Sequence, residues 1–112
     1  MKLTNKYDQI SLAGASLAAV SSKFLSSNAA FWDHVVIAKQ LHHIKRVVVV
    51  DHRDCGAYKV VYGKDFAGAD GPETAQHKSV MQSLRAELAR RHPDLASDFY
   101  LMALDGRVEK II

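Results

Sequence analysis

Four consecutive valines, residues 47–50, limit the possible folds of this chain more than any other feature. Valine is branched at Cβ, which disfavours helix and suits the pleated surface of a sheet. The run is apolar at every position, whereas a strand with one solvated face alternates apolar and polar residues. We therefore predict a strand over residues 44–51 that is covered on both faces, as in a parallel sheet.

The residues before the valines predict one strand and two helices. Apolar residues in segment 7–13, closed by Gly14, indicate a short buried strand. Apolar residues at helical spacing follow over 17–25, and Asn28 is a residue type that caps a second helix, which would run to about residue 43.

The residues after the valines continue the alternation of helices and strands. A glycine-rich loop is expected over 63–71, and Pro72 suits the first position of a helix that ends at His92. Strands are predicted over 99–104 and 108–112, separated by a turn. The expected fold is a single α/β domain, 1–112, with a mostly parallel sheet flanked by helices.

Composition narrows the functional classes. The chain has 15 Lys+Arg and 12 Asp+Glu, and we find no stripe of interleaved basic and aromatic residues, so nucleic-acid binding is not expected. No run of 18 apolar residues exists, so no membrane-spanning helix is expected. A single cysteine excludes an intrachain disulfide and favours a reducing compartment, the cytoplasm.

Side chains that can bind a metal or carry a charge are concentrated in the turn after the valine strand. His52 and Cys55 are three residues apart, and an imidazole with a thiolate suits tetrahedral zinc. Gly56 would let the backbone turn sharply beside the sulfur, and Asp51 and Asp54 are candidate partners that orient the ligands. The alternative is that Cys55 is a small buried hydrophobe and His52 a polar strand end.

The sequence His52-x-x-Cys55-Gly56-Ala57 after a valine-rich strand resembles the second zinc half-site of the β-class carbonic anhydrases. Residues 11–16 stand where that family has an Asn-Ala-Gly stretch, and a helix over 31–43 precedes the strand as in the family. The resemblance implies a zinc cofactor and a zinc-bound hydroxide that attacks carbon dioxide to give bicarbonate. It also implies Asp54 in a supporting catalytic role and a homo-oligomer, since family members are dimers or larger.

The family's first zinc cysteine lies in a Cys-x-Asp-x-Arg motif that this chain does not contain. In the family, the strand bearing that motif lies centrally, between the strands that match residues 7–13 and 44–51. Three explanations follow: the natural product is longer, the two flanking strands pair directly, or another chain fills the gap. Zinc held by only two protein ligands would be bound weakly.

His77 is the candidate for a replacement ligand or a proton relay. It shares a helix face with Glu73 at i, i+4 spacing, and the alternative is a solvated or capping histidine. His42 and His43 are read as the end of a helix rather than a metal pair, because adjacent residues diverge around the helix.

Two functions remain open from the sequence. One is a carbonic anhydrase-like zinc enzyme with carbon dioxide and bicarbonate as substrates. The other is a catalytically inactive relative that acts as a binding or oligomeric domain, with Trp32 and the apolar helix faces as subunit contacts.

Overall fold

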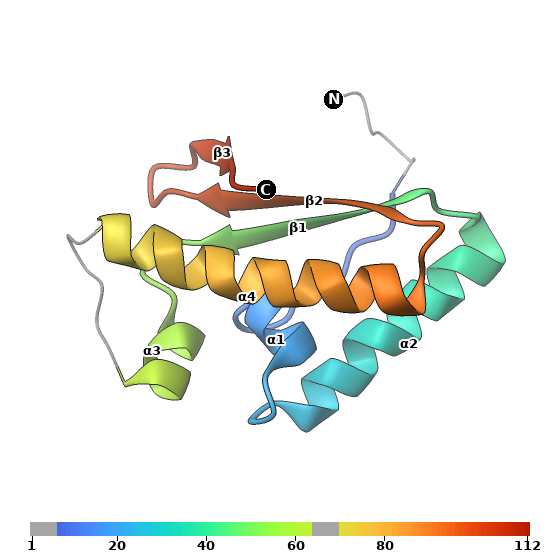
Figure 1. Cartoon of the computed structure of the whole chain (residues 1–112), viewed down its shortest axis with the longest axis horizontal. Coiled ribbons are helices and arrows are strands. Elements are labelled where there is room, and N and C mark those ends of the chain that lie inside the picture. The colour runs from blue at the N-terminus through green and yellow to red at the C-terminus, as the bar shows by residue number, and fades with distance from the viewer. Residues whose placement is uncertain (1–6, 64–69) are drawn as a thin grey trace.

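The computed structural model describes residues 7–63 and 70–112 (Figure 1). Most of the predicted loop over 63–71 falls on residues 64–69, outside the described part. The elements in chain order are α1 (Ser16–Val20), α2 (Leu25–His42), β1 (Arg46–His52), α3 (Gly56–Tyr62), α4 (Asp70–Arg91), β2 (Ala96–Met102) and β3 (Val108–Lys110).

The described strands form one three-stranded sheet in the order β1-β2-β3. β1 pairs with β2 in parallel, with Val49 opposite Phe99, and β2 pairs with β3 in antiparallel fashion. The α/β class is thus confirmed, and the sheet is mixed, with one parallel and one antiparallel pairing. Figure 1 shows α4 running along the sheet, and α1 packs between α4 and α2.

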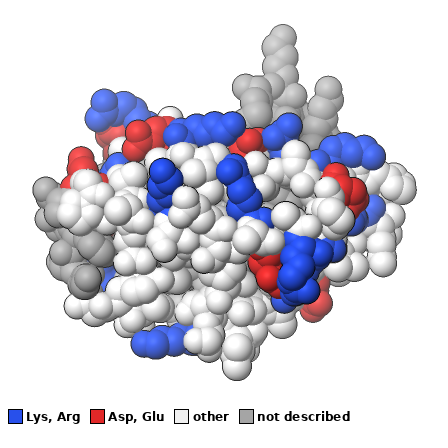
Figure 2. All heavy atoms as spheres, in the orientation of Figure 1, with Lys and Arg blue, Asp and Glu red and all other residues white. Residues whose placement is uncertain are grey.

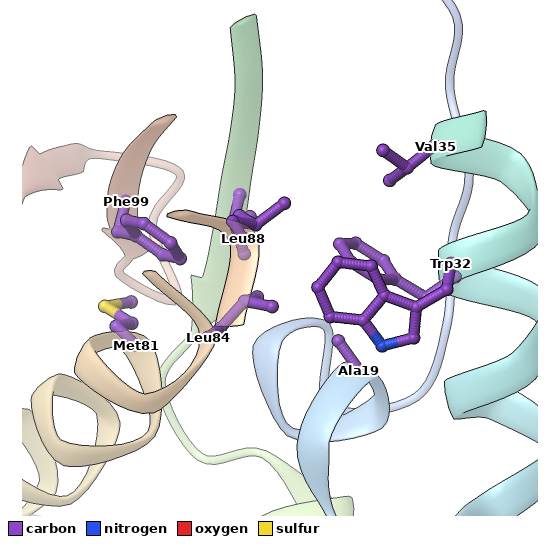
Figure 3. Packing of buried hydrophobic residues seen from close by; sticks show 9 residues of the cluster. Ala19, Trp32, Val35, Met81, Leu84, Leu88 and Phe99 are labelled. Atoms are coloured by element: carbon purple, nitrogen blue, oxygen red, sulfur yellow. The ribbon is translucent and has the colours of Figure 1, made fainter. Parts of the chain in front are cut away.

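The main core lies between the sheet and the helices (Figure 3). α4 contributes Met81, Leu84 and Leu88, which share this cluster with Phe99 of β2 and with residues of α1 and α2. These α4 residues recur at spacings of three and four, which places them on one face of the helix. The remaining buried members of the cluster are Ala19, Phe31, Trp32, Val35 and Val49.

The valine strand is covered on one face only. Val49 is 7% exposed, whereas Val48 and Val50 are 42% and 40% exposed. Successive side chains of a strand point to opposite faces, so Val49 enters the core and its neighbours face outward. The expectation of burial on both faces is therefore wrong for the described residues.

β1 is also an edge strand within the described sheet. Ala96 N–H donates to Lys45 O, and Arg53 N–H donates to Met102 O. In a parallel ladder, alternate residues bond the same neighbour, so the odd-numbered residues of β1 bond β2. The N–H and C=O groups of Val48 and Val50 therefore point toward the free edge, where no described backbone group bonds them.

Three local predictions before β1 need correction. Residues 7–12 are irregular, not a strand, because no described strand pairs with them. The first helix is only the short α1, and α2 already begins at Leu25. Asn28 lies inside α2, where its side-chain amide donates to the carbonyls of Ala18, Ser21 and Phe24 instead of capping the helix.

The predictions for the other elements agree better with the structure. α4 ends at Arg91, just before His92, and β2 and β3 lie near their expected positions. His43 has a left-handed φ of 52° and its N–H donates to Lys39 O, so it closes the end of α2 as expected. The short helix α3 was not anticipated, because residues 51–58 suggested only a polar turn.

No helix in the described residues is long and apolar enough to span a membrane. Figure 2 shows that basic and acidic side chains are interspersed over the face it presents, with a wide uncharged area between them. The charge of this face is therefore not concentrated in a single patch of one sign.

Candidate functional site: the turn at the end of β1

A short turn, residues 52–55, leaves the carboxyl end of β1 and leads into α3; we call it the His-Cys turn. Ligand sites of open α/β sheets gather at the carboxyl ends of strands. The turn changes direction at Asp54, which has a left-handed φ of 55°. Gly56, which was expected to make the turn, is instead the first residue of α3 and has no positive φ.

His52 projects from the sheet on its exposed face. Its Nδ1 lies 2.9 Å from Arg53 O. A carbonyl can only accept a hydrogen bond, so Nδ1 carries a proton and donates it. In the neutral ring, Nε2 then keeps its lone pair. Metal-binding histidines are commonly held in this way, with the second ring nitrogen bonded to a carbonyl or carboxylate.

Cys55 lies in different surroundings from His52. It is 5% exposed and packs in a small apolar cluster with Leu17, Tyr58 and Val80. A metal ion would have to reach this apolar cluster to contact the Cys55 sulfur.

Asp51 points the opposite way from His52, into the core. Its carboxylate accepts hydrogen bonds from Ser16 N–H at 2.9 Å, Ser16 Oγ at 2.5 Å, Tyr58 OH at 2.9 Å and His77 Nδ1 at 2.7 Å. We call these four residues the Asp51 cluster. They come from α1, β1, α3 and α4, so the cluster joins four elements beneath the turn.

The Asp51 cluster is closed to solvent. Its members are at most 2% exposed, and the ring of His77 lies 3.9 Å from that of Tyr58. Burial, and then the nearby charge of Asp51, raise the pKa of Tyr58 far above its ordinary value, so the phenol stays protonated and donates. His77 is therefore a buried partner of Asp51, rather than the solvated or capping histidine of the alternative reading.

Glu73 of α4 is not part of the Asp51 cluster, but it bonds two residues of the His-Cys turn. One carboxylate oxygen accepts the N–H of Asp54 at 2.7 Å, and the other accepts a guanidinium N–H of Arg53 at 3.2 Å. Arg53 also donates to Asp70 O, Thr74 and Glu109. Glu73 is 5% exposed, and with His77 it forms the shared α4 face that the i, i+4 spacing predicted.

Asp54, the predicted supporting catalytic residue, uses its side chain differently. Its carboxylate forms an ion pair with Lys59 of α3 at 2.5 Å, and it is partly exposed. Asp51 was expected to orient the ligands but is occupied by the core cluster. The reason is the two-residue period of a strand, which separates residues 51 and 52 onto opposite faces.

Zinc binding requires three or four protein ligands. Within residues 7–63 and 70–112, no group of three or more His, Cys, Asp or Glu side chains could hold a metal ion. His52 and Cys55 are donors of the kind zinc prefers, but they are too few to make a site alone. A zinc site here would need at least one further ligand from outside the described residues.

Sequence reasoning did not assign roles to Ser16, Tyr58 and Glu73. The only local indication of this cluster is Asp51 itself, which directly follows four valines. If that strand is buried, its carboxylate needs buried hydrogen-bond donors. The donors themselves lie 7 to 35 residues away in the chain, so no local pattern identifies them.

The molecule is thus a small α/β protein with a dense hydrogen-bonded turn at the end of a parallel strand. It is 38% identical over 109 residues to an uncharacterized protein of Rickettsia conorii. It is 35% identical over 109 residues to an uncharacterized protein of Rickettsia bellii. No family model and no solved structure matches the chain.

Each alignment includes 97% of this chain, but it covers only 59% of the R. conorii protein and 66% of the R. bellii protein. The chain therefore spans about three fifths to two thirds of the length of these relatives. Each alignment extends over nearly the whole of this chain.

Proposed function

We propose that this chain is a carbonic anhydrase-like zinc protein in which His52 and Cys55 supply two metal ligands. The support comes from their residue types, their three-residue spacing and their place at the carboxyl end of a parallel strand. The single most telling observation is the Nδ1 bond of His52, which leaves Nε2 as the lone-pair donor.

The proposal requires a third ligand from outside the described residues, from another segment or another copy of the chain. Bound zinc lowers the pKa of a coordinated water toward neutrality, which is the chemistry that carbon dioxide hydration uses. The role of this chain's own residues is narrower. His52 and Cys55 bind, and Asp54 and Lys59 form a charged pair beside them.

Zinc content tests the metal-binding part of the proposal. We expect the purified protein to bind close to one zinc per site, and both His52→Ala and Cys55→Ser to lose it. His34→Ala, on the exposed surface of α2, is the matched control and should bind zinc like the wild type. Cobalt substitution adds a direct readout, because a thiolate–cobalt charge-transfer band should disappear in Cys55→Ser.

Carbon dioxide hydration by the zinc-loaded protein tests the enzymatic part. A rate above buffer that falls in His52→Ala supports the enzyme. Stoichiometric zinc with no rate above buffer would restrict the function to metal binding.

A second candidate is a non-catalytic binding or oligomeric domain. It is favoured by the apolar surroundings of Cys55 and by the exposed edge and outer face of β1. A well-folded protein that takes up no zinc, and that associates in sedimentation at micromolar concentration, would favour this function over the first.

A further inference from the structure

His92, which lies outside the candidate site, joins the end of α2 to the end of α4. It follows Arg91, the last residue of α4. Its Nδ1 lies 3.1 Å from Nζ of Lys39 on α2, and its ring stacks on Trp32 of the same helix with ring centroids 6.2 Å apart. The main contacts of α2 with another element are with the short helix α1, so His92 gives α2 a further attachment near its C-terminal end.

The bond between Lys39 and His92 requires a neutral imidazole. A lysine ammonium can only donate hydrogen bonds, so Nδ1 of His92 accepts and carries no proton. In the protonated ring both nitrogens carry a proton, and no acceptor remains. Protonation would therefore replace a hydrogen bond with two positively charged groups that face each other at close range.

The charged groups around His92 come from three segments. Lys39 on α2 and Arg91 at the end of α4 are positive, whereas Asp94 on the following loop is negative and bonds Lys39 at 2.8 Å. Burial, and then the charge of Lys39, lower the pKa of His92 from its ordinary value of 6.5. Asp94 opposes this shift and Arg91 adds to it, and the net direction is downward.

We propose that His92 is an acid-sensitive latch: its neutral ring holds the end of α2 against the end of α4, and its protonation loosens α2 there. Because the pKa of His92 is lowered in the folded protein, the neutral ring stabilises the fold fully above the ordinary pKa of 6.5. This contribution is lost as the pH falls through the lower pKa of the folded state.

The latch is separate from the His-Cys turn and goes beyond the proposed function. It lies near the amino ends of β1 and β2, where Ala96 N–H donates to Lys45 O, and it involves no metal. Lys39 keeps its bond to Asp94 when His92 is protonated, so we expect a loosened end of α2 and not an unfolded protein. Trp32, the one tryptophan of the chain, is 8% exposed and reports this change.

The test is a titration from about pH 8 to about pH 5, the range in which histidine takes up its proton. It compares wild type with His92→Asn, whose amide oxygen can accept from Lys39 but does not titrate. His34→Asn, on the exposed surface of α2, is the matched control. Amide exchange in the last turn of α2 is measured by NMR and corrected for the intrinsic effect of pH.

In wild type and in His34→Asn, we expect these amides to exchange roughly fivefold faster in acid, with a red shift of the Trp32 emission maximum. In His92→Asn, neither signal should change. Far-UV circular dichroism checks that the variant is folded, and His92→Gln replaces it if it is not.

Two outcomes would overturn the latch. The ¹⁵N signals of the His92 ring show when it takes up a proton, and a ring that titrates while the α2 amides keep their exchange rates has no effect on the helix. The same acid response in His92→Asn as in wild type would assign the change to another group.

Discussion

At the scale of single residues, the most important feature is that Asp51 and His52 lie on opposite faces of β1. Adjacent positions in one strand send a carboxylate into the core and an imidazole to the surface. The buried carboxylate is stable there because three side chains and one backbone N–H donate to it. A buried charge without such donors would be expensive.

Asp51→Asn should therefore be strongly destabilising. An amide keeps one acceptor oxygen but presents an NH₂ group to donors, so several hydrogen bonds of Ser16, Tyr58 and His77 are lost. We expect the free energy of unfolding to fall by about 3 kcal/mol, as for a buried pair that loses one partner. Urea denaturation measures it.

The exposed Asp33→Asn on α2 is the control for that substitution and should stay within about 0.5 kcal/mol of wild type. A loss below about 1 kcal/mol in Asp51→Asn would mean that the cluster contributes little to stability.

At the scale of elements, β1 differs from the strand its sequence suggested. Its inward residues pack against α4 and β2, but its outward valines are two-fifths exposed and its outer edge has no described partner. Long apolar edge strands are usually covered, charged or bent in natural proteins. Among the described residues, the charged side chains of β1 stand near its two ends: Arg46, whose guanidinium forms an ion pair with Asp98, and the inward-pointing Asp51.

Hydrogen exchange resolves this edge residue by residue. The amides of Val47 and Val49 bond β2, whereas those of Val48 and Val50 point outward. We expect the outward amides to exchange roughly tenfold or more faster than the inward ones, since they have no hydrogen-bonded partner. The measurement is NMR-detected exchange on the isolated protein.

Equal protection of all four valine amides would contradict this expectation. It would show that a further strand, from residues outside the described part or from another copy of the chain, pairs with β1 in solution.

At the scale of the whole molecule, stability depends on α4. This helix packs against α1 and β2, and its Met81, Leu84 and Leu88 belong to the same buried cluster as Trp32 of α2 (Figure 3). Its N-terminal part also supplies Glu73 and His77 to the turn. One helix therefore connects the main core with the candidate site.

Leu84→Ala should destabilise the entire chain. Leu84 is fully buried, so its truncation leaves a cavity, and we expect a loss of about 2–5 kcal/mol. Val60→Ala on α3 is the control, since Val60 is 73% exposed and should change stability by less than about 0.5 kcal/mol. Thermal unfolding is followed by the fluorescence of Trp32 and by circular dichroism.

If the molecule unfolds as one unit, the two probes should give the same midpoint in wild type and in Leu84→Ala. Separate midpoints would show that α2, which carries Trp32, unfolds independently of the rest.

Much of the fold could be predicted from local pattern. The valine run predicted β1, and the residues before Pro93 predicted where α4 ends. Residues 7–13 also have the composition of a strand, but a strand needs a neighbour to bond with, and none of the described strands pairs with them.

The candidate site was predictable only in part. The sequence alone identified the turn after β1 and its His and Cys donors, because residue type and spacing are local properties. It could not show that Asp51 would bind Ser16 and His77, or that Glu73 would hold Asp54, because those partners lie far apart in the chain. Only packing of the helices on the sheet brings them together, and burial then makes each of their hydrogen bonds necessary.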